Sequence, residues 1–230
     1  NDITDKYRGP KEVHIFFTHT HWDHVQSFPF FTPSYRDDWT IHLYALNKGL
    51  GDLRKIFARM YQFRYFPVPF DVLPSRMYFH NLKYDDEINL GGSLVRVNHP
   101  GLALGYRIES EGGSLFFASD SAPFRDFLFE DKYTSRENQL TGEEQKAILP
   151  YEEKLFADIR GVNLLFHDAN YTAQEYQRFI TYGHSSIDYA LETAETCGVR
   201  ELVLWHHDRS RTDDALEDIT EPFIFKGKKA

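Results

Sequence analysis

At 230 residues, the chain is long enough to bury a substantial core, and we expect residues 1–230 to form a single domain. Its formal net charge of -9 argues against long nucleic acids as partners, because an acidic surface gains nothing from counterion release on a polyphosphate. A small anionic substrate beside a metal centre remains compatible with that charge. One cysteine, Cys197, excludes an internal disulfide and favours a reducing compartment. Because no apolar run has the length of a membrane span and no signal peptide is visible, we expect a cytoplasmic protein with no membrane partner. Self-association into a homo-oligomer is compatible with the sequence.

A histidine-rich motif follows the first predicted strand, residues 13–17. Three histidines and one aspartate fall within six positions, in the order His19, His21, Asp23 and His24. Imidazole and carboxylate are ligands that borderline divalent metals prefer. His19 and His21 are two apart at the end of an extended segment and point the same way, so they can hold one metal. If the chain then turns into a helix, Asp23 and His24 face a second metal.

The next part of the chain predicts mainly structural elements. We expect a strand, an amphipathic helix and two further strand-like segments, over 41–45, 49–62, 75–79 and 87–97. Two aromatic loops interrupted by prolines, 28–35 and 61–70, are suited to stack a base or, equally, to pack on each other. The remaining histidines here have no ligand-type neighbours in the sequence, and we assign them to the core or the surface: His14, His42 and His80.

A predicted hairpin, with strands over 103–108 and 114–120, carries candidate ligands at both ends. His99 lies at its entry and Asp120 at its exit, so the two residues meet at one sheet edge. The segment that follows, 125–155, is the most hydrophilic part of the chain, and we expect an exposed insertion or a helical lid there.

Strands and helices alternate in the C-terminal part. The pattern predicts strands over 162–166 and 201–205, and helices over 172–180, 185–198 and 212–219, the second opened by a capping box of Ser185 and Asp188. The two strands end in His167-Asp168 and His206-His207, and of the last pair we favour His206 as a ligand. Like the earlier candidates, these residues stand where an apolar strand stops, which is where layered α/β folds build their sites.

These residues resemble the metallo-β-lactamase superfamily. Its H-x-H-x-D-H motif is matched by His19, His21, Asp23 and His24, and its later ligands by His99, Asp120 and His206. The ribonuclease Z-like phosphodiesterase branch is the most similar, because of His167-Asp168-Ala169, Gly183-His184-Ser185-Ser186 and the strand that ends in His206. The resemblance implies an α/β (α+β) fold, a four-layer αβ/βα sandwich of two mixed sheets with helices outside.

The chain departs from this family in two places. Family members place several strands and a glycine-rich turn before the motif, whereas only about a dozen polar residues precede it here. We therefore expect the first sheet to lack its N-terminal strands, or another chain to supply them. The tRNA-processing members also insert a long arm between the equivalents of His99 and Asp120. Here 20 residues separate the two, which argues against tRNA maturation.

The resemblance implies a metal-dependent hydrolase with two divalent ions, with zinc expected and manganese or iron as alternatives. In it, His19, His21 and His99 hold one ion, Asp23, His24 and His206 hold the other, and Asp120 bridges them. A hydroxide shared by the ions is the nucleophile. The catalytic residues are Asp23, His184, which protonates the leaving group, and Asp168, which orients His184. We expect a phosphodiesterase on a small or cyclic nucleotide-type diester. The alternatives are a thioester or lactone hydrolase of the glyoxalase II or lactonase type, and a non-catalytic metal-bound binding or sensor module.

Overall fold

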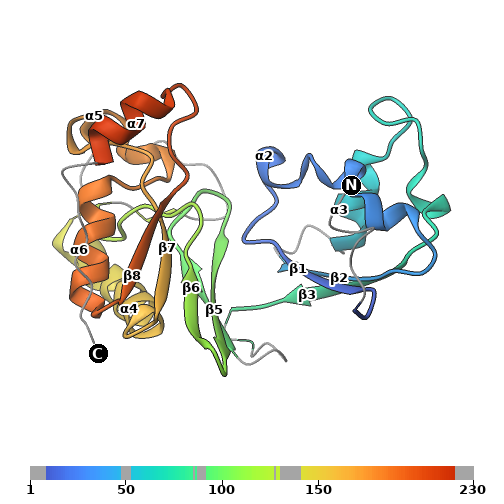
Figure 1. The fold of residues 1–230 in the computed structure, drawn as a ribbon. Helices are drawn as coiled ribbons and strands as arrows, with labels where there is room; N and C mark the ends of the chain where they lie inside the picture. Colours follow the sequence, from blue (N-terminus) through green and yellow to red (C-terminus); the bar gives the residue numbers. More distant parts are fainter. Residues whose placement is uncertain are drawn as a thin grey trace. The chain divides into compact units, whose positions relative to one another are not determined.

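The computed structural model describes residues 9–47, 53–84, 86, 92–126, 128–129 and 141–220. The chain divides into two compact units, residues 1–83 and 84–230, and each is described by itself. The expectation of a single domain stays a prediction. Figure 1 shows that each unit contains one β-sheet with helices packed against it. Among the described residues, no helix combines the length and the apolar character needed to cross a bilayer.

Unit 1 is built on a parallel three-stranded sheet. Its strands follow the order β1-β2-β3 and are β1 (Glu12–Phe16), β2 (Thr40–Leu46) and β3 (Arg76–Leu82). The motif turns into a short helix, α2 (Trp22–Val25), and the aromatic, proline-containing segments form 3-10 turns at η1 (Phe28–Phe30), η2 (Thr32–Tyr35) and η3 (Phe70–Val72). The predicted strands over 13–17, 41–45 and 75–79 are therefore confirmed to within a few residues.

The core of unit 1 lies between this sheet and helix α3 (Leu53–Met60) (Figure 1). Because side chains alternate along a strand, one face presents Ile41, Leu43 and Ala45 to the helix. Phe57 of α3 is fully buried against them. The predicted helix over 49–62 is confirmed from residue 53 onward, and residues 48–52 lie outside the described part of the chain.

Unit 2 is built on a mixed five-stranded sheet in the order β4-β5-β6-β7-β8. The first three strands are antiparallel and the last three parallel: β4 (Gly92–Val97), β5 (Ala103–Ser110), β6 (Gly113–Phe117), β7 (Leu164–Asp168) and β8 (Glu201–Trp205). The predicted hairpin is confirmed as β5 and β6. Of the predicted strand over 87–97, the part from residue 92 is confirmed, and residues 87–91 lie outside the described chain.

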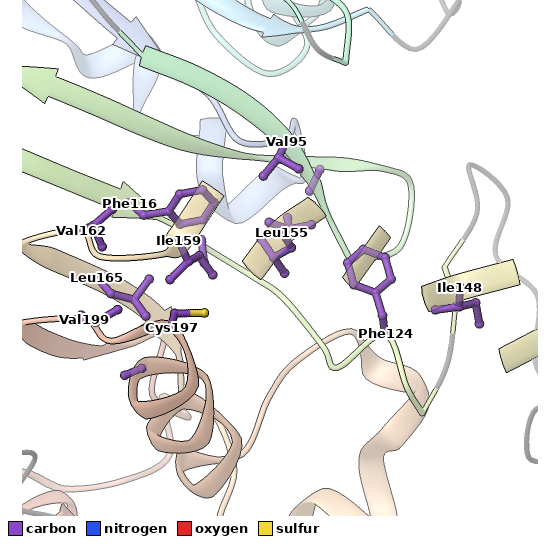
Figure 2. Packing of buried hydrophobic residues seen from close by; sticks show 14 residues of the cluster. Val95, Phe116, Phe124, Ile148, Leu155, Ile159, Val162, Leu165, Cys197 and Val199 are labelled. Atoms are coloured by element: carbon purple, nitrogen blue, oxygen red, sulfur yellow. The ribbon is translucent and has the colours of Figure 1, made fainter. Parts of the chain in front are cut away.

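Helices α4 (Gly142–Ile159) and α6 (Ile187–Cys197) cover one face of this sheet. Figure 2 shows their buried side chains against Phe116 and Leu165 of the strands, with Cys197 among them. Within the segment 125–155, where an exposed insertion or lid is expected, α4 is exposed along most of its length, but the expectation misses its buried side: Ile148 and Leu155 lie in the core, as does Ile159 at the end of the helix. Residues 130–140 lie outside the described chain.

Two smaller helical segments precede α6, namely α5 (Ala173–Phe179) and η4 (Ile180–Tyr182), and α7 (Asp213–Thr220) follows β8. The expected capping box of Ser185 and Asp188 is wrong by one residue. Ser186 is the N-cap of α6, and its hydroxyl accepts a hydrogen bond from the Tyr189 amide at 3.2 Å. The Ser185 hydroxyl instead donates to the Ser121 carbonyl, which ties two loops together at the sheet edge. The helix stops as expected at Gly198, whose φ is 65°.

Candidate metal centre

In unit 1, the four residues of the motif gather at the end of β1. His19 is almost fully buried, and its ring centroid lies 4.4 Å from that of His21 and 4.2 Å from that of His24. Thr18 Oγ1 lies 3.1 Å from His19 Nδ1, so the local hydrogen bond engages Nδ1 and directs Nε2 away. Asp23 stands in the first turn of α2, with one carboxylate oxygen 3.4 Å from His24 Nε2. Three imidazoles and a carboxylate therefore converge here, as the motif predicts.

Two buried residues next to the motif anchor it to the core of unit 1. Val25, the last residue of α2, is buried, and so is Phe28 directly after the helix. Both belong to the core formed with Phe57 of α3. The chain must therefore turn sharply at His21, the N-cap of α2, to bring the ligand side chains to the surface of that core.

An open cavity of about 470 Å³ lies next to the motif within unit 1. Its lining combines apolar and aromatic side chains with one cation, and is made by Thr20, Trp22, Val25, Ile56, Arg59, Met60, Gln62 and Tyr65. Trp22 is 60% exposed and Tyr65 73% exposed, so both rings are available to a ligand. Such a cavity suits a small molecule with a flat, apolar part and a negative charge.

In unit 2, three predicted ligands meet at the ends of the strands. Asp120 Oδ2 lies 3.4 Å from His206 Nε2 and 3.9 Å from His99 Nε2, and both Asp120 and His99 are buried. Ligand atoms about 2.0–2.2 Å from one tetrahedral or octahedral ion are separated by roughly 2.9–3.6 Å. The donor types and the shorter of these spacings therefore fit a divalent metal ion, whereas the 3.9 Å between Asp120 Oδ2 and His99 Nε2 lies outside this range.

His184 and Asp168 form a tight pair beside these ligands. His184 Nδ1 donates to Asp168 Oδ2 at 2.7 Å, and the His184 ring stacks on His206 with centroids 4.7 Å apart. Asp168 is fully buried and also accepts hydrogen bonds at 3.1 Å from three backbone amides, those of Ser121, Asn170 and Ser185. Four donors converge on this carboxylate, and because a carboxylate oxygen accepts, the hydrogen bond sets the His184 tautomer with the proton on Nδ1.

Gly183 and Asn170 also shape the centre, although sequence reasoning gave neither a role there. The Gly183 carbonyl accepts a hydrogen bond from His99 Nδ1 at 2.8 Å, which leaves Nε2 to face Asp120. Gly183 has a φ of 88°, and a side chain there would approach the Pro100 ring at 2.3 Å, so glycine is required. The Asn170 amide lies 3.0 Å from His206 Nδ1 and donates to the His206 carbonyl at 2.8 Å, which fixes both ring and backbone.

The neighbouring histidines His167 and His207 lie differently. His167 is fully buried, its Nδ1 donates to the Asp168 carbonyl at 2.8 Å, and burial lowers its pKa. Its ring meets Tyr189 of α6, so it belongs to the helix-packed side of the sheet. Burial also lowers the pKa of His207, which hydrogen-bonds to backbone groups of Leu204 and Ala169. His206, by contrast, faces Asp120 in the cluster.

His14, His42 and His80, assigned from the sequence to the core or the surface, are half-buried and have ligand-type neighbours that the sequence analysis did not identify. They lie together on the face of the unit 1 sheet opposite α3, because the parallel register sets His14 against His42 and Tyr44 against His80. Glu12 is part of the same group. One strand read alone shows only that Glu12 and His14 share a face of β1, since the rest of the cluster depends on the pairing of three strands.

No known family model matches this sequence, and no curated protein matches it either. Solved structures do match. The metallo-beta-lactamase fold protein YhfI from Bacillus subtilis is 14% identical with a TM-score of 0.60, over 93% of this chain and 72% of that chain. The chain has a metallo-β-lactamase fold.

Two further structures share the metallo-β-lactamase fold with this chain. The short form of human tRNase Z is 17% identical with a TM-score of 0.58, over 85% of this chain and 73% of its own. A diphosphatase of the PhnP family is 18% identical with a TM-score of 0.55, over 96% of this chain and 72% of its own. The mixed α/β fold class expected from the H-x-H-x-D-H motif is thereby confirmed.

Proposed function

We propose that the chain is a metal-dependent hydrolase that uses two divalent ions, zinc first, with manganese or iron as alternatives. Its seven ligands are those implied by the sequence: His19, His21, Asp23, His24, His99, Asp120 and His206. Within each unit, these side chains converge with donor types and spacings that suit such ions. Bound ions would acidify a water and stabilise negative charge on a substrate.

The observation that carries the proposal of phosphodiester hydrolysis is the His184–Asp168 pair. Its 2.7 Å hydrogen bond fixes Nδ1, so a proton held at His184 Nε2 is available to a leaving alkoxide. Asp168 faces the side of the ring away from that proton and stabilises the positive imidazolium. A poor leaving group such as an alkoxide needs this proton, whereas carbonyl hydrolysis at a metal centre needs it less. The pair therefore favours a phosphodiesterase over a thioester or lactone hydrolase.

We further propose a small, nucleotide-type diester as the substrate. The cavity beside the motif offers Trp22 and Tyr65 for stacking on a base and Arg59 for a negative charge. The net charge of -9 disfavours a long polyanion. The connection between His99 and Asp120 consists mainly of the β5–β6 hairpin, so it contains no arm that could grip an RNA.

The test is a comparison of substrates on the protein supplied with zinc or manganese. Hydrolysis of bis-p-nitrophenyl phosphate and of a 2′,3′-cyclic nucleotide is expected, with little turnover of a thioester or a lactone. Thioester-only or lactone-only turnover would overturn the phosphodiesterase proposal, and no turnover of any of them would favour a binding or sensor module.

The role of His184 is tested by His184→Ala. Loss of the acid should slow cyclic nucleotide opening by about 10²–10⁴-fold. Hydrolysis of bis-p-nitrophenyl phosphate should slow much less, because p-nitrophenolate leaves without a proton. Metal content, measured by inductively coupled plasma mass spectrometry, should stay at two ions per chain, in addition to any ion bound at another site. Loss of an ion with His184→Ala would make His184 a ligand and refute its role as acid.

A further inference from the structure

The face of the unit 1 sheet opposite α3 carries a second group of metal-ligand side chains. Glu12 Oε1 lies 3.2 Å from His14 Nε2 and 3.2 Å from His42 Nε2. In the described part of the chain, both ion-pair contacts of Glu12 go to these two imidazoles. The side-chain exposures are 48% for Glu12, 28% for His14 and 18% for His42, so none of the three side chains is fully buried.

The spacing of these atoms matches coordination geometry. Two ligand atoms about 2.1 Å from one ion, at an angle between 90° and 109°, are roughly 3.0–3.4 Å apart. Both nitrogen–oxygen distances fall inside that window at 3.2 Å. The His14 and His42 rings stack with centroids 4.5 Å apart and planes 11° apart, so their Nε2 atoms lie side by side, next to the same carboxylate oxygen.

The far nitrogen of each ring is also held. His14 Nδ1 lies 3.0 Å from the Tyr44 hydroxyl, and His42 Nδ1 lies 2.9 Å from His80 Nε2. Metal-binding histidines commonly donate their second N–H to such a neighbour, which fixes the tautomer and aims the other lone pair at the ion. If Tyr44 and His80 accept in this way, two lone pairs and a carboxylate face one point. That arrangement attracts a cation.

We propose that Glu12, His14 and His42 form a further site for a divalent transition metal of the zinc class, separate from the H-x-H-x-D-H motif. Two imidazoles and one carboxylate are a ligand set that suits Zn²⁺, Co²⁺ or Ni²⁺ and leaves positions for water. The ligands come from two neighbouring parallel strands, β1 and β2, so the ion links them and stabilises the sheet. His80 and Tyr44 are positioning residues for this site.

A hydrogen-bonded network without metal is the competing explanation of the same contacts. It requires protons on both Nε2 atoms, with Tyr44 and His80 as donors. A measurement of zinc binding separates the two explanations. Only a metal site binds a zinc ion that is lost when the Glu12 carboxylate is replaced by a neutral group.

The experiment measures zinc by equilibrium dialysis on the full chain carrying His19→Ala and His21→Ala, which weaken the motif. Glu12→Gln in this background should remove one zinc per chain, whereas Asp37→Asn, which removes one negative charge from an exposed position of unit 1, should remove none. His80→Gln should weaken binding of that zinc by about 10–100-fold. Zinc should also raise the Tm, by an amount that Glu12→Gln diminishes and Asp37→Asn does not.

Circular dichroism checks that each variant is folded, and His42→Gln replaces Glu12→Gln if the latter is not. Equal zinc content and affinity in all four backgrounds, or an equal loss with Asp37→Asn, would refute the site. The dinuclear proposal is tested separately, in a chain with Glu12 intact. There, His19→Ala and His21→Ala should lower the number of ions bound at the motif. Either site can therefore be refuted while the other stands.

Discussion

Replacing Asp168 with asparagine removes one negative charge from the centre of unit 2 and keeps the size of the side chain. Asp168 Oδ1 accepts from the amides of Asn170 and Ser185, and Oδ2 accepts from the Ser121 amide and from His184. Asparagine can keep only one of these oxygens. If the asparagine oxygen takes the place of Oδ1, its NH2 group takes the place of Oδ2 and faces the Ser121 amide. Two hydrogen-bond donors then oppose each other.

The expected loss of stability follows from that mismatch. Leaving one buried N–H without an acceptor costs about 1–3 kcal/mol. His184 can recover a hydrogen bond only by accepting from the new NH2 group at Nδ1, which moves its proton to Nε2 in the neutral ring. In that tautomer, no carboxylate stabilises the positive charge that a second proton would bring to the His184 ring. We therefore expect an unfolding free energy lower by about 1–3 kcal/mol and cyclic nucleotide hydrolysis slower by about 10²–10⁴-fold.

The assay combines urea unfolding with hydrolysis of two diesters at a temperature where every variant is folded. Cyclic nucleotide opening should fall far more than hydrolysis of bis-p-nitrophenyl phosphate. Thr141→Ala is the matched control, because it breaks the capping box of α4 and costs about 1 kcal/mol without changing the acid. Equal slowing of both diesters, or cyclic nucleotide rates within a few-fold of the unchanged protein, would refute the role given to Asp168.

Three other predictions concern the cores and the titrating groups. Phe57→Ala should destabilise unit 1 by about 3–5 kcal/mol in thermal unfolding, because this fully buried ring packs on Phe17 and Phe28; a loss under 1 kcal/mol would contradict the described core. Burial raises the pKa of Glu152, so its contribution to stability is present below its ordinary pKa and is lost as pH rises through the raised value. Glu152→Gln should therefore be more stable than the unchanged protein near pH 7, with the difference gone in acid; the opposite order near pH 7 would show that the carboxylate is net stabilising. Burial raises the pKa of Cys197 to about 11, so at pH 8 its thiol should react with Ellman's reagent only as fast as the protein unfolds; rapid labelling of the folded protein would contradict this.

The sequence predicted the strand ends well because both signals there are local. An apolar run followed by His, Asp or Asn marks the end of a buried strand, and this placed Asp120, Asp168 and His206 correctly at the sheet edge of unit 2. The sequence did not predict the buried side of α4, where charged residues outnumber the few apolar ones that face the core. Ile148 and Leu155 stand seven residues apart, a helical repeat that the surrounding charges obscured.

Contacts that depend on strand pairing were out of reach. His14 and His42 become neighbours only through the register of β1 and β2, and Tyr44 and His80 only through that of β2 and β3. The same holds for Gly183 and His99, which are 84 positions apart in the chain yet share a hydrogen bond. A single sequence carries no periodic signal for such pairs, so the sequence cannot predict them.

Backbone conformation links the ligands to the stability of the fold. Among the described residues, three that are not glycine have a positive φ, namely Leu102 at 64°, Ser119 at 52° and His206 at 57°. All three lie at or within three positions of a candidate ligand, and each conformation costs about 1–3 kcal/mol. Local contacts hold two of them, since Asn170 grips His206 and the Ser119 hydroxyl donates to Asp120 at 3.2 Å. Ligation of a metal ion by Asp120 and His206 would offset this strain, so removal of metal should lower the Tm even where the hydrogen bonds around Asp168 stay intact.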